Sequence, residues 1–259
     1  MSLRMALLVF VVVLGGCSAM GGSKDADTSY KDADVVPIKD AAEPNALLGV
    51  EYMKAGRNNQ AMEHLQRALI HDPDLPIAHN AIAVLYERLG EDERAEAHFK
   101  RVIELSPQDS DALNNYGRFL CTLERYDEAT AAFDRALANP LYTKPQNTYT
   151  NLGLCAMRDG ERELAEHYFR QALGKSPNFP PALMQMAKLS WDSGNALQAR
   201  AYLQRLTARI RPGPSVLWLG VQVERNLGDR AAANAYALQL RANFPTSPET
   251  KLLLTSEKR

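Results

Sequence analysis

The chain lacks the features that would point to catalysis or to nucleic-acid binding. Its 259 residues carry 30 lysines and arginines against 31 aspartates and glutamates, so no basic excess is available to neutralise the phosphates of DNA or RNA. Its five histidines form no His-Glu-x-x-His motif, and neither a glycine-rich phosphate loop nor a recognisable nucleophile motif is present. We therefore expect a protein that is not an enzyme, binds no nucleic acid and needs no cofactor or metal.

Apolar runs of membrane-spanning length are also missing. The run Met5–Leu14, which follows Arg4, is far too short to cross a bilayer as a helix but suits the apolar region of a secretory signal. The Leu-Gly-Gly-Cys that follows resembles a bacterial lipobox, in which a peptidase cuts before a diacylated cysteine. That resemblance implies a signal peptide over residues 1–16 and acylation of Cys17, and the alternative is an ordinary signal that leaves Cys17 as a free thiol.

The lipobox resemblance also carries an expectation about location. Several acyl chains on one cysteine give stable anchoring where a single chain would be marginal. By resemblance to such lipoproteins, Ser18 favours sorting to the outer membrane. We therefore expect the protein in the inner leaflet of the outer membrane, facing the periplasm.

Residues 17–41 differ in composition from the rest of the chain. They are rich in glycine, serine, lysine and aspartate and contain few large apolar side chains, so they cannot bury enough surface to offset the entropy of ordering. We predict a lipidated flexible tether with a root-mean-square length of about 25 to 30 Å. Its mixed charges give no polybasic reason for further contact with anionic lipid.

Residues 42–259 are organised by a period of 34 residues. The units start at Ala42, Pro76, Ser110, Gln146, Pro180 and Pro214, and every spacing is 34 except the third, which is 36. Glycine or alanine stands at the eighth position of five units and alanine at the twentieth of all six, as in Gly117 and Ala129, with a proline near the end of each unit. This pattern is that of the tetratricopeptide repeat.

The physical meaning of the repeat is a helical hairpin. Two apolar segments of helical period flank a glycine turn in five of the units, and one hairpin cannot bury both of its faces, so neighbours must stack. We predict an all-α fold, a right-handed tetratricopeptide-repeat solenoid of six helical hairpins. Residues 249–256, with leucines at 252, 253 and 254, are predicted to form a C-terminal capping helix.

Two cysteines fall in adjacent first helices of this scheme, Cys121 in the third unit and Cys155 in the fourth. In an oxidising compartment they could form a disulfide if their Cα atoms lie within about 7 Å. We expect two separate, partly buried thiols, with the disulfide as the alternative.

The first helices of such a fold line its concave surface, which makes that surface the candidate partner site. In the first two units the positions concerned are mostly apolar, where exposure to solvent is expected, and such a groove suits an amphipathic helix or an extended tail. The alternative is that these side chains belong to the core. The candidate residues are Val50, Met53, Ile77, Asn80, Val84, Asn114, Trp191 and Trp218.

The local sequence adds a more specific resemblance. The segment LNNYGRFL (113–120), the segment RYDEA (125–129), the two-residue insertion and the lipobox together resemble the type IV pilus biogenesis and stability lipoproteins, the pilotins of the pilus secretin. The resemblance implies that the chain binds secretin subunits and promotes their outer-membrane localisation and multimerisation. The alternatives are a scaffold lipoprotein for outer-membrane protein assembly or cell-wall synthesis, and an enzyme with an unrecognised site.

Overall fold

The computed structural model describes residues 38–257. The predicted signal peptide (1–16), Cys17 and the predicted tether as far as residue 37 lie outside the described residues. The last residues of that tether are described: Lys39–Ala41 form a short 3-10 helix, η2, that leads into the first α-helix. Just before it, the backbone N–H of Ile38 donates a hydrogen bond to Nδ1 of His71 at 3.0 Å.

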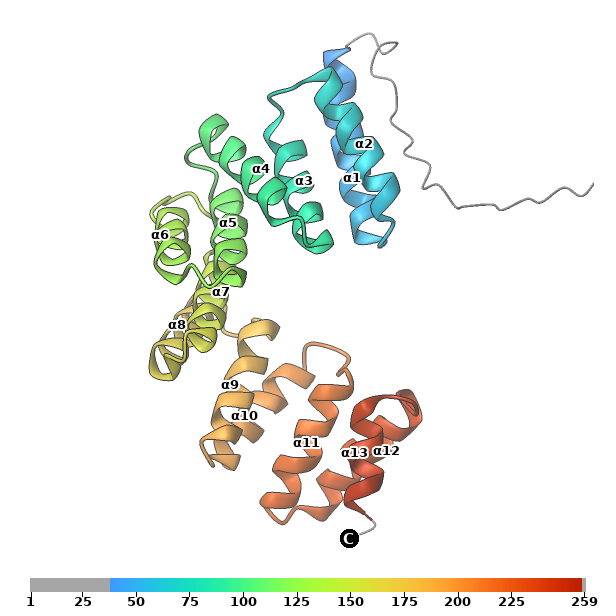
Figure 1. The fold of residues 1–259 in the computed structure, drawn as a ribbon. Helices are drawn as coiled ribbons and strands as arrows, with labels where there is room; N and C mark the ends of the chain where they lie inside the picture. The colour runs from blue at the N-terminus through green and yellow to red at the C-terminus, as the bar shows by residue number, and fades with distance from the viewer. Residues whose placement is uncertain (1–37, 258–259) are drawn as a thin grey trace, which may run out of the picture. The chain divides into compact units, whose positions relative to one another are not determined.

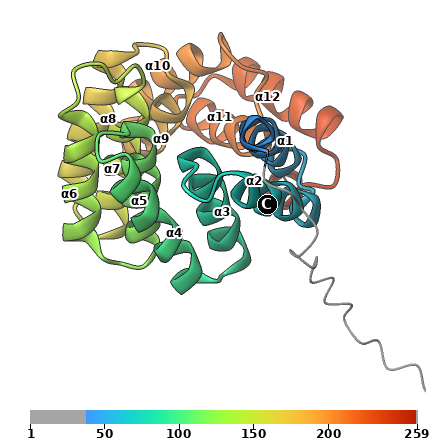
Figure 2. The same cartoon turned by 90° about the horizontal axis from the view of Figure 1, so that it is seen from above.

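Residues 38–257 contain thirteen α-helices and no β-strand (Figure 1). The helices are α1 (Ala42–Lys54), α2 (Asn58–His71), α3 (Pro76–Leu89), α4 (Asp92–Leu105), α5 (Ser110–Thr122), α6 (Tyr126–Leu137), α7 (Pro145–Arg158), α8 (Arg162–Lys175), α9 (Pro180–Asp192), α10 (Ala196–Thr207), α11 (Pro214–Asn226), α12 (Arg230–Asn243) and α13 (Pro248–Ser256). The first twelve pack in consecutive pairs, and each pair lies beside the next one along the chain (Figure 2). The predicted all-α fold is confirmed. None of the helices within residues 38–257 combines the length and the hydrophobicity of a membrane-spanning segment.

The turn inside each hairpin passes through one residue in the left-handed region. Five of these residues are the predicted glycines, with φ between 72° and 87°. In the third hairpin the same place is taken by Glu124, with φ 60°. Because a side chain at positive φ is crowded by its own backbone, this turn is strained where the other five are not.

A small residue on the first helix of a hairpin lets a large side chain of the second helix approach closely. In the fourth hairpin, a Cβ placed on Gly153 would lie 2.5 Å from a ring carbon of Phe169, which is fully buried. In the sixth hairpin the contact is made one residue earlier than the repeat predicts, because Gly220 rather than Val221 faces a ring, that of Tyr236. The first helix and the turn glycine of the sixth hairpin lie where the repeat predicts, and only the glycine that meets the ring is displaced by one residue.

The expectation for the two cysteines is wrong. Cys121 of α5 and Cys155 of α7 form a disulfide, with their Cα atoms 5.7 Å apart. The bond joins the third hairpin to the fourth, which are connected by the loop between α6 and α7 that contains the two-residue insertion. Both residues are only 3% exposed. The structure therefore has a buried cross-link where the sequence predicts two separate, partly buried thiols.

The C-terminal cap forms as predicted, as α13, but only one of its three leucines enters the core. Leu253 is fully buried against α11 and α12, whereas Leu252 is 53% exposed and Leu254 is 46% exposed. The helix begins with Ser247 accepting a hydrogen bond from the backbone N–H of Thr250. Successive residues of a helix point in different directions, so three consecutive leucines cannot share one buried face.

Candidate partner-binding groove

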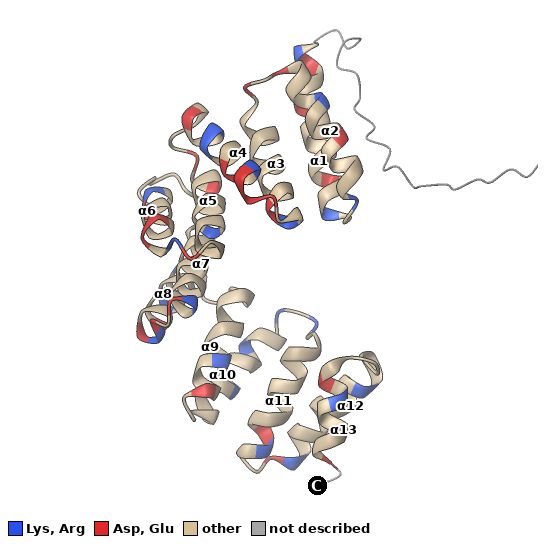
Figure 3. Cartoon of the chain, in the orientation of Figure 1, with Lys and Arg blue, Asp and Glu red and all other residues tan. Residues whose placement is uncertain are grey.

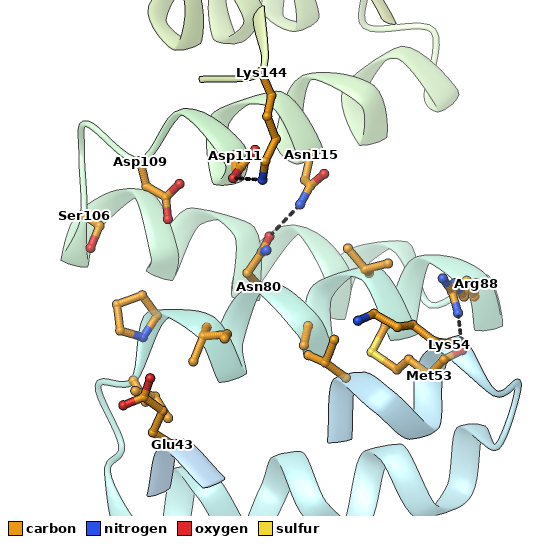
Figure 4. A pocket seen from close by; sticks show the side chains of 16 residues that line it. Glu43, Met53, Lys54, Asn80, Arg88, Ser106, Asp109, Asp111, Asn115 and Lys144 are labelled. Atoms are coloured by element: carbon orange, nitrogen blue, oxygen red, sulfur yellow. Dashed lines mark hydrogen bonds and ion pairs between the residues drawn. The ribbon is translucent and has the colours of Figure 1, made fainter. Parts of the chain in front are cut away.

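A groove of about 920 Å³ lies across the first helices of the first two hairpins and the starts of α5 and α7 (Figure 4). We call this site the groove. Its apolar floor comes from Val50 and Met53 of α1, from Ile77, Ala81 and Val84 of α3, and from Leu75 and Pro76. Five of the eight predicted partner-binding residues line it: Val50, Met53, Ile77, Asn80 and Val84.

The five residues differ in how much they expose. Ile77 is 36% exposed, and Val50 and Val84 are half-buried. Met53 is only 7% exposed and packs in the core cluster that contains Leu65 and Leu85. The prediction that Met53 is an exposed apolar side chain is therefore wrong, because the neighbouring hairpin covers it and leaves only its edge to the groove.

The predicted partner residue Asn114 serves another purpose. It is 7% exposed, and its Oδ1 accepts a hydrogen bond from Nδ2 of Asn151 at 2.9 Å. The same kind of bond joins Asn115 Nδ2 to Asn80 Oδ1 at 3.2 Å, one hairpin earlier. Asn114 thus ties α5 to α7 and exposes little surface to a partner, whereas Asn80 remains half-buried in the wall of the groove.

The two tryptophans lie away from the groove. Trp191 of α9 packs against the large core cluster around Met186, and Trp218 of α11 packs against the C-terminal cluster around Leu217. Both are half-buried, and neither lines the groove. The structure therefore divides the predicted residues among the groove, an inter-helix hydrogen bond and the packing of the last two hairpins.

Charged side chains stand at opposite ends of the groove (Figure 4). Lys54 and Arg88 lie where α1 and α3 end, and Arg88 donates to the backbone carbonyl of Met53 at 3.1 Å. Glu43 and Asp109 lie where α1 and α5 begin. The arrangement gives the apolar floor a cationic end and an acidic end.

Polar contacts hold the walls of the groove in place. Asp111 at the start of α5 pairs with Lys144 at 2.9 Å. Arg118 of α5 binds Glu87 of α3 through both carboxylate oxygens, at 2.5 and 2.6 Å. A two-pronged guanidinium-carboxylate contact fixes orientation as well as distance. The groove is therefore pre-formed, which reduces the ordering entropy that a partner would otherwise have to overcome.

A contact between buried His79 and half-buried His98 was not foreseen from the sequence. The Nδ1 atoms of His79 on α3 and His98 on α4 lie 2.9 Å apart, and Nε2 of His79 lies 2.8 Å from the carbonyl of Pro73. Since that carbonyl can only accept, His79 carries its proton on Nε2, and Nδ1 of His98 is the donor to Nδ1 of His79. Burial, reinforced by repulsion from His79, lowers the pKa of His98 to about 4.

Across residues 38–257, no group of three or more histidine, cysteine, aspartate or glutamate side chains is placed to hold a metal ion. The groove combines an apolar floor, bonded amides and separated charges, which are the elements of protein recognition.

Known proteins share both the sequence and the fold. Tetratricopeptide-repeat models match residues 47–110, 93–142 and 156–217. The type IV pilus assembly protein PilF of Pseudomonas aeruginosa is 30% identical over 246 residues, which cover 94% of this chain and 95% of that protein. The chain belongs to the tetratricopeptide-repeat family of type IV pilus biogenesis factors. The family resemblance seen in the sequence is thereby confirmed.

Two solved structures of this family superpose on the chain. The crystal structure of PilW, a widely conserved type IV pilus biogenesis factor, is 33% identical with a TM-score of 0.72 and covers 82% of this chain and 98% of its own. A solved structure of Pseudomonas aeruginosa PilF is 28% identical with a TM-score of 0.71 and covers 84% of this chain and 98% of its own.

Proposed function

We propose that the protein is an outer-membrane lipoprotein that binds the subunits of the type IV pilus secretin and promotes their localisation and multimerisation. The relationship to PilF and PilW supports a role in pilus biogenesis. The lipobox ending at Cys17 supports the membrane anchor. The groove supplies the surface on which a subunit would dock.

The observation that carries the proposal is the apolar floor that α1 and α3 leave uncovered. Val50, Ile77 and Val84 retain exposed surface although they neighbour one another across two packed helices. Exposed apolar surface rimmed by polar groups is typical of protein interaction sites. The bonds from Arg118 to Glu87 and from Asn115 to Asn80 keep this surface open.

In this proposal the protein acts by binding alone. A secretin subunit that docks in the groove is held near the membrane by the acylated N-terminus, which raises its effective concentration there. Multimerisation then becomes more favourable because the subunits meet in one leaflet. No covalent step and no cofactor are required.

The experiment introduces charge at two half-buried residues of the groove floor, and a thermal melt of each variant reports on folding. In Val50→Glu with Val84→Glu, two carboxylates replace half-buried floor residues, and we expect loss of secretin multimers because an unpaired charge buried at an interface is strongly unfavourable. Met53→Glu is avoided, because Met53 is buried and its replacement would test folding. The measurement is the amount of secretin multimer in the outer-membrane fraction of cells that carry each variant.

The control introduces two glutamates at apolar residues outside the groove. Leu197 of α10 is 66% exposed and Leu238 of α12 is 68% exposed, and Leu197→Glu with Leu238→Glu should leave the multimers at the wild-type level. Normal multimers in the groove variant, with a normal thermal melt, contradict the proposal. Affinity capture of a cell-wall synthase or an assembly machine in place of secretin selects the alternative scaffold function.

A further inference from the structure

The chemistry of the groove specifies more than an apolar ligand, and the inference that follows rests on the proposed function. The floor residues Val50, Ile77 and Val84 belong to helices, and within residues 38–257 no β-strand is available to pair with an extended ligand. An extended segment on this floor would find few partners for its backbone N–H and C=O groups, since the amides of Asn80 and Asn115 in the groove wall bond to each other. A helix satisfies its own backbone groups and can lay an apolar stripe on the floor.

The size of the groove agrees with a short helix. Two turns of helix about 10 Å across and about 11 Å long occupy roughly 850 Å³, close to the 920 Å³ of the groove. Ile77 and Val84 lie seven residues apart on one face of α3, which is about two turns. The length of the floor thus matches that of an apolar stripe formed by residues i, i+3, i+4 and i+7 of a ligand helix.

The two ends of the groove carry charges of opposite sign. At the end where α1 and α3 finish, Arg88 has no acidic partner among the described residues, and Lys54 makes only an exposed pair with Glu51. Such exposed pairs are weak and leave the ammonium free to turn to another carboxylate. At the opposite end, Glu43 has no ion-pair partner among the described residues, and Asp109 bonds only to the backbone N–H of Ala112.

The helix dipoles are opposite in sign to these side-chain charges at each end of the groove. The carbonyl ends of α1 and α3 lie beside Lys54 and Arg88, and the carbonyl end of a helix attracts positive partial charge. A ligand helix that runs antiparallel to α1 and α3 brings its N–H end to this place. Its first turn favours acidic side chains and its last turn basic ones, so the two ends of the groove complement the two ends of the ligand.

We propose that the groove binds an amphipathic helical segment of the partner in one direction, antiparallel to α1 and α3, with acidic side chains in its first turn and basic side chains in its last. The acidic turn lies over Lys54 and Arg88, and the basic turn lies over Glu43 and Asp109. The apolar face of the segment covers Val50, Ile77 and Val84.

Two synthetic peptides of identical composition test this direction. Both carry leucines at i, i+3, i+4 and i+7; one has glutamates in its first turn and lysines in its last, and the other has these charges exchanged. Binding to the full chain in phosphatidylcholine nanodiscs is measured by fluorescence anisotropy, with empty nanodiscs as the blank. We expect the acidic-first peptide to bind about tenfold more tightly, because several individually weak pairs change sign together, and the preference should shrink at high salt.

A charge-exchanged protein completes the test. In Lys54→Glu with Arg88→Glu and Glu43→Lys, the preference should reverse in favour of the basic-first peptide. Equal binding of both peptides to the wild type, abolished in both by Val50→Glu with Val84→Glu, overturns the direction but leaves the groove as the partner site. A wild-type preference for the basic-first peptide also overturns the direction. Failure of both peptides to bind overturns the helical ligand, and normal secretin multimers in the Val50 and Val84 variant would overturn the proposed function separately.

Discussion

A Cβ placed on Gly117 would lie 2.8 Å from two ring carbons of Phe133. Gly117 is on the first helix of the third hairpin and Phe133, which is fully buried, is on the second. The two helices therefore approach each other to a distance that only glycine permits. This contact recurs at Gly153 with Phe169 and fixes the spacing inside these hairpins.

Gly117→Ala should destabilise the protein by about 1 to 3 kcal/mol, because a methyl group has no room against a fully buried ring. The higher helix propensity of alanine would by itself stabilise the helix by up to about 1 kcal/mol. Gly174→Ala in α8 isolates that second effect, since nothing lies within 4 Å of a Cβ at Gly174. In urea unfolding, Gly117→Ala should be less stable than the wild type and Gly174→Ala more stable. Equal free energies of unfolding for the two variants would contradict the close contact.

Glu124→Gly should stabilise the protein by about 1 kcal/mol. Glu124 holds φ 60° in the turn of the third hairpin, and the left-handed conformation costs a residue with a side chain about that much relative to glycine. The reverse change, Gly90→Ala, should destabilise by a similar amount, because Gly90 ends α3 at φ 75°. Thermal melts of the two variants measure both effects, and a lower melting temperature for Glu124→Gly would show that the glutamate has a compensating contact.

The fold could be predicted from the sequence because one contact is repeated in each unit. A period of 34 residues brings small positions such as Gly117 and Gly153 opposite large ones such as Phe133 and Phe169, and a turn glycine at positive φ follows each first helix except that of the third hairpin. The displaced pair Gly220 and Tyr236 is the exception. The sequence does not reveal this pair, because the repeat expects the small and the large residue at positions 221 and 237, which are Val221 and Ala237.

The site could be predicted only in part, because exposure depends on the neighbouring hairpin. Val50 and Met53 both fall on the concave face by repeat position, yet Met53 is buried against Leu65 and Leu85. Asn114 is bonded to Asn151, a partner that lies beyond the two-residue insertion. The register of α5 against α7 decides this contact and the disulfide alike, and a repeat period does not specify it where an insertion intervenes.

Replacing both Cys121 and Cys155 with serine should lower the free energy of unfolding by about 3 to 4 kcal/mol. The disulfide closes a loop whose ends are 34 residues apart, and a loop of that length restricts the unfolded chain by about this amount. Melts of the wild type with and without reductant, beside the double variant, measure the effect. If reductant leaves the wild-type melt unchanged, the two thiols are not joined in the protein.

Cys17→Ala should leave the repeats folded and remove the protein from the outer-membrane fraction. Cys17 is the predicted acylation site, and anchoring by acyl chains does not depend on the helical core. Membrane fractionation gives the location, and circular dichroism of the purified variant gives its helix content and melt. Persistence of the variant in the outer membrane would contradict lipid anchoring, and loss of helix content would show that folding needs the anchor.

Protonation of His98 should weaken the second hairpin as the pH falls. The pKa of His98 is lowered to about 4 by burial and by His79, whereas an unfolded histidine titrates near 6.5. Between these values the unfolded chain binds more protons, so the free energy of unfolding decreases as the pH is lowered from about 6.5 to about 4. We expect a loss of about 1 kcal/mol, less than for a fully buried histidine, because half-buried His98 is screened by water.

His98→Gln separates this effect from the carboxylates that titrate in the same range. The glutamine amide can still donate to Nδ1 of His79, but it does not titrate. The variant should therefore lose less stability than the wild type between pH 7 and pH 4.5 in urea unfolding. His167→Gln replaces an exposed histidine of α8 and should follow the wild type at both pH values. If His98→Gln and the wild type lose the same free energy, the pH response arises elsewhere, and the contact of His98 with His79 is structural alone.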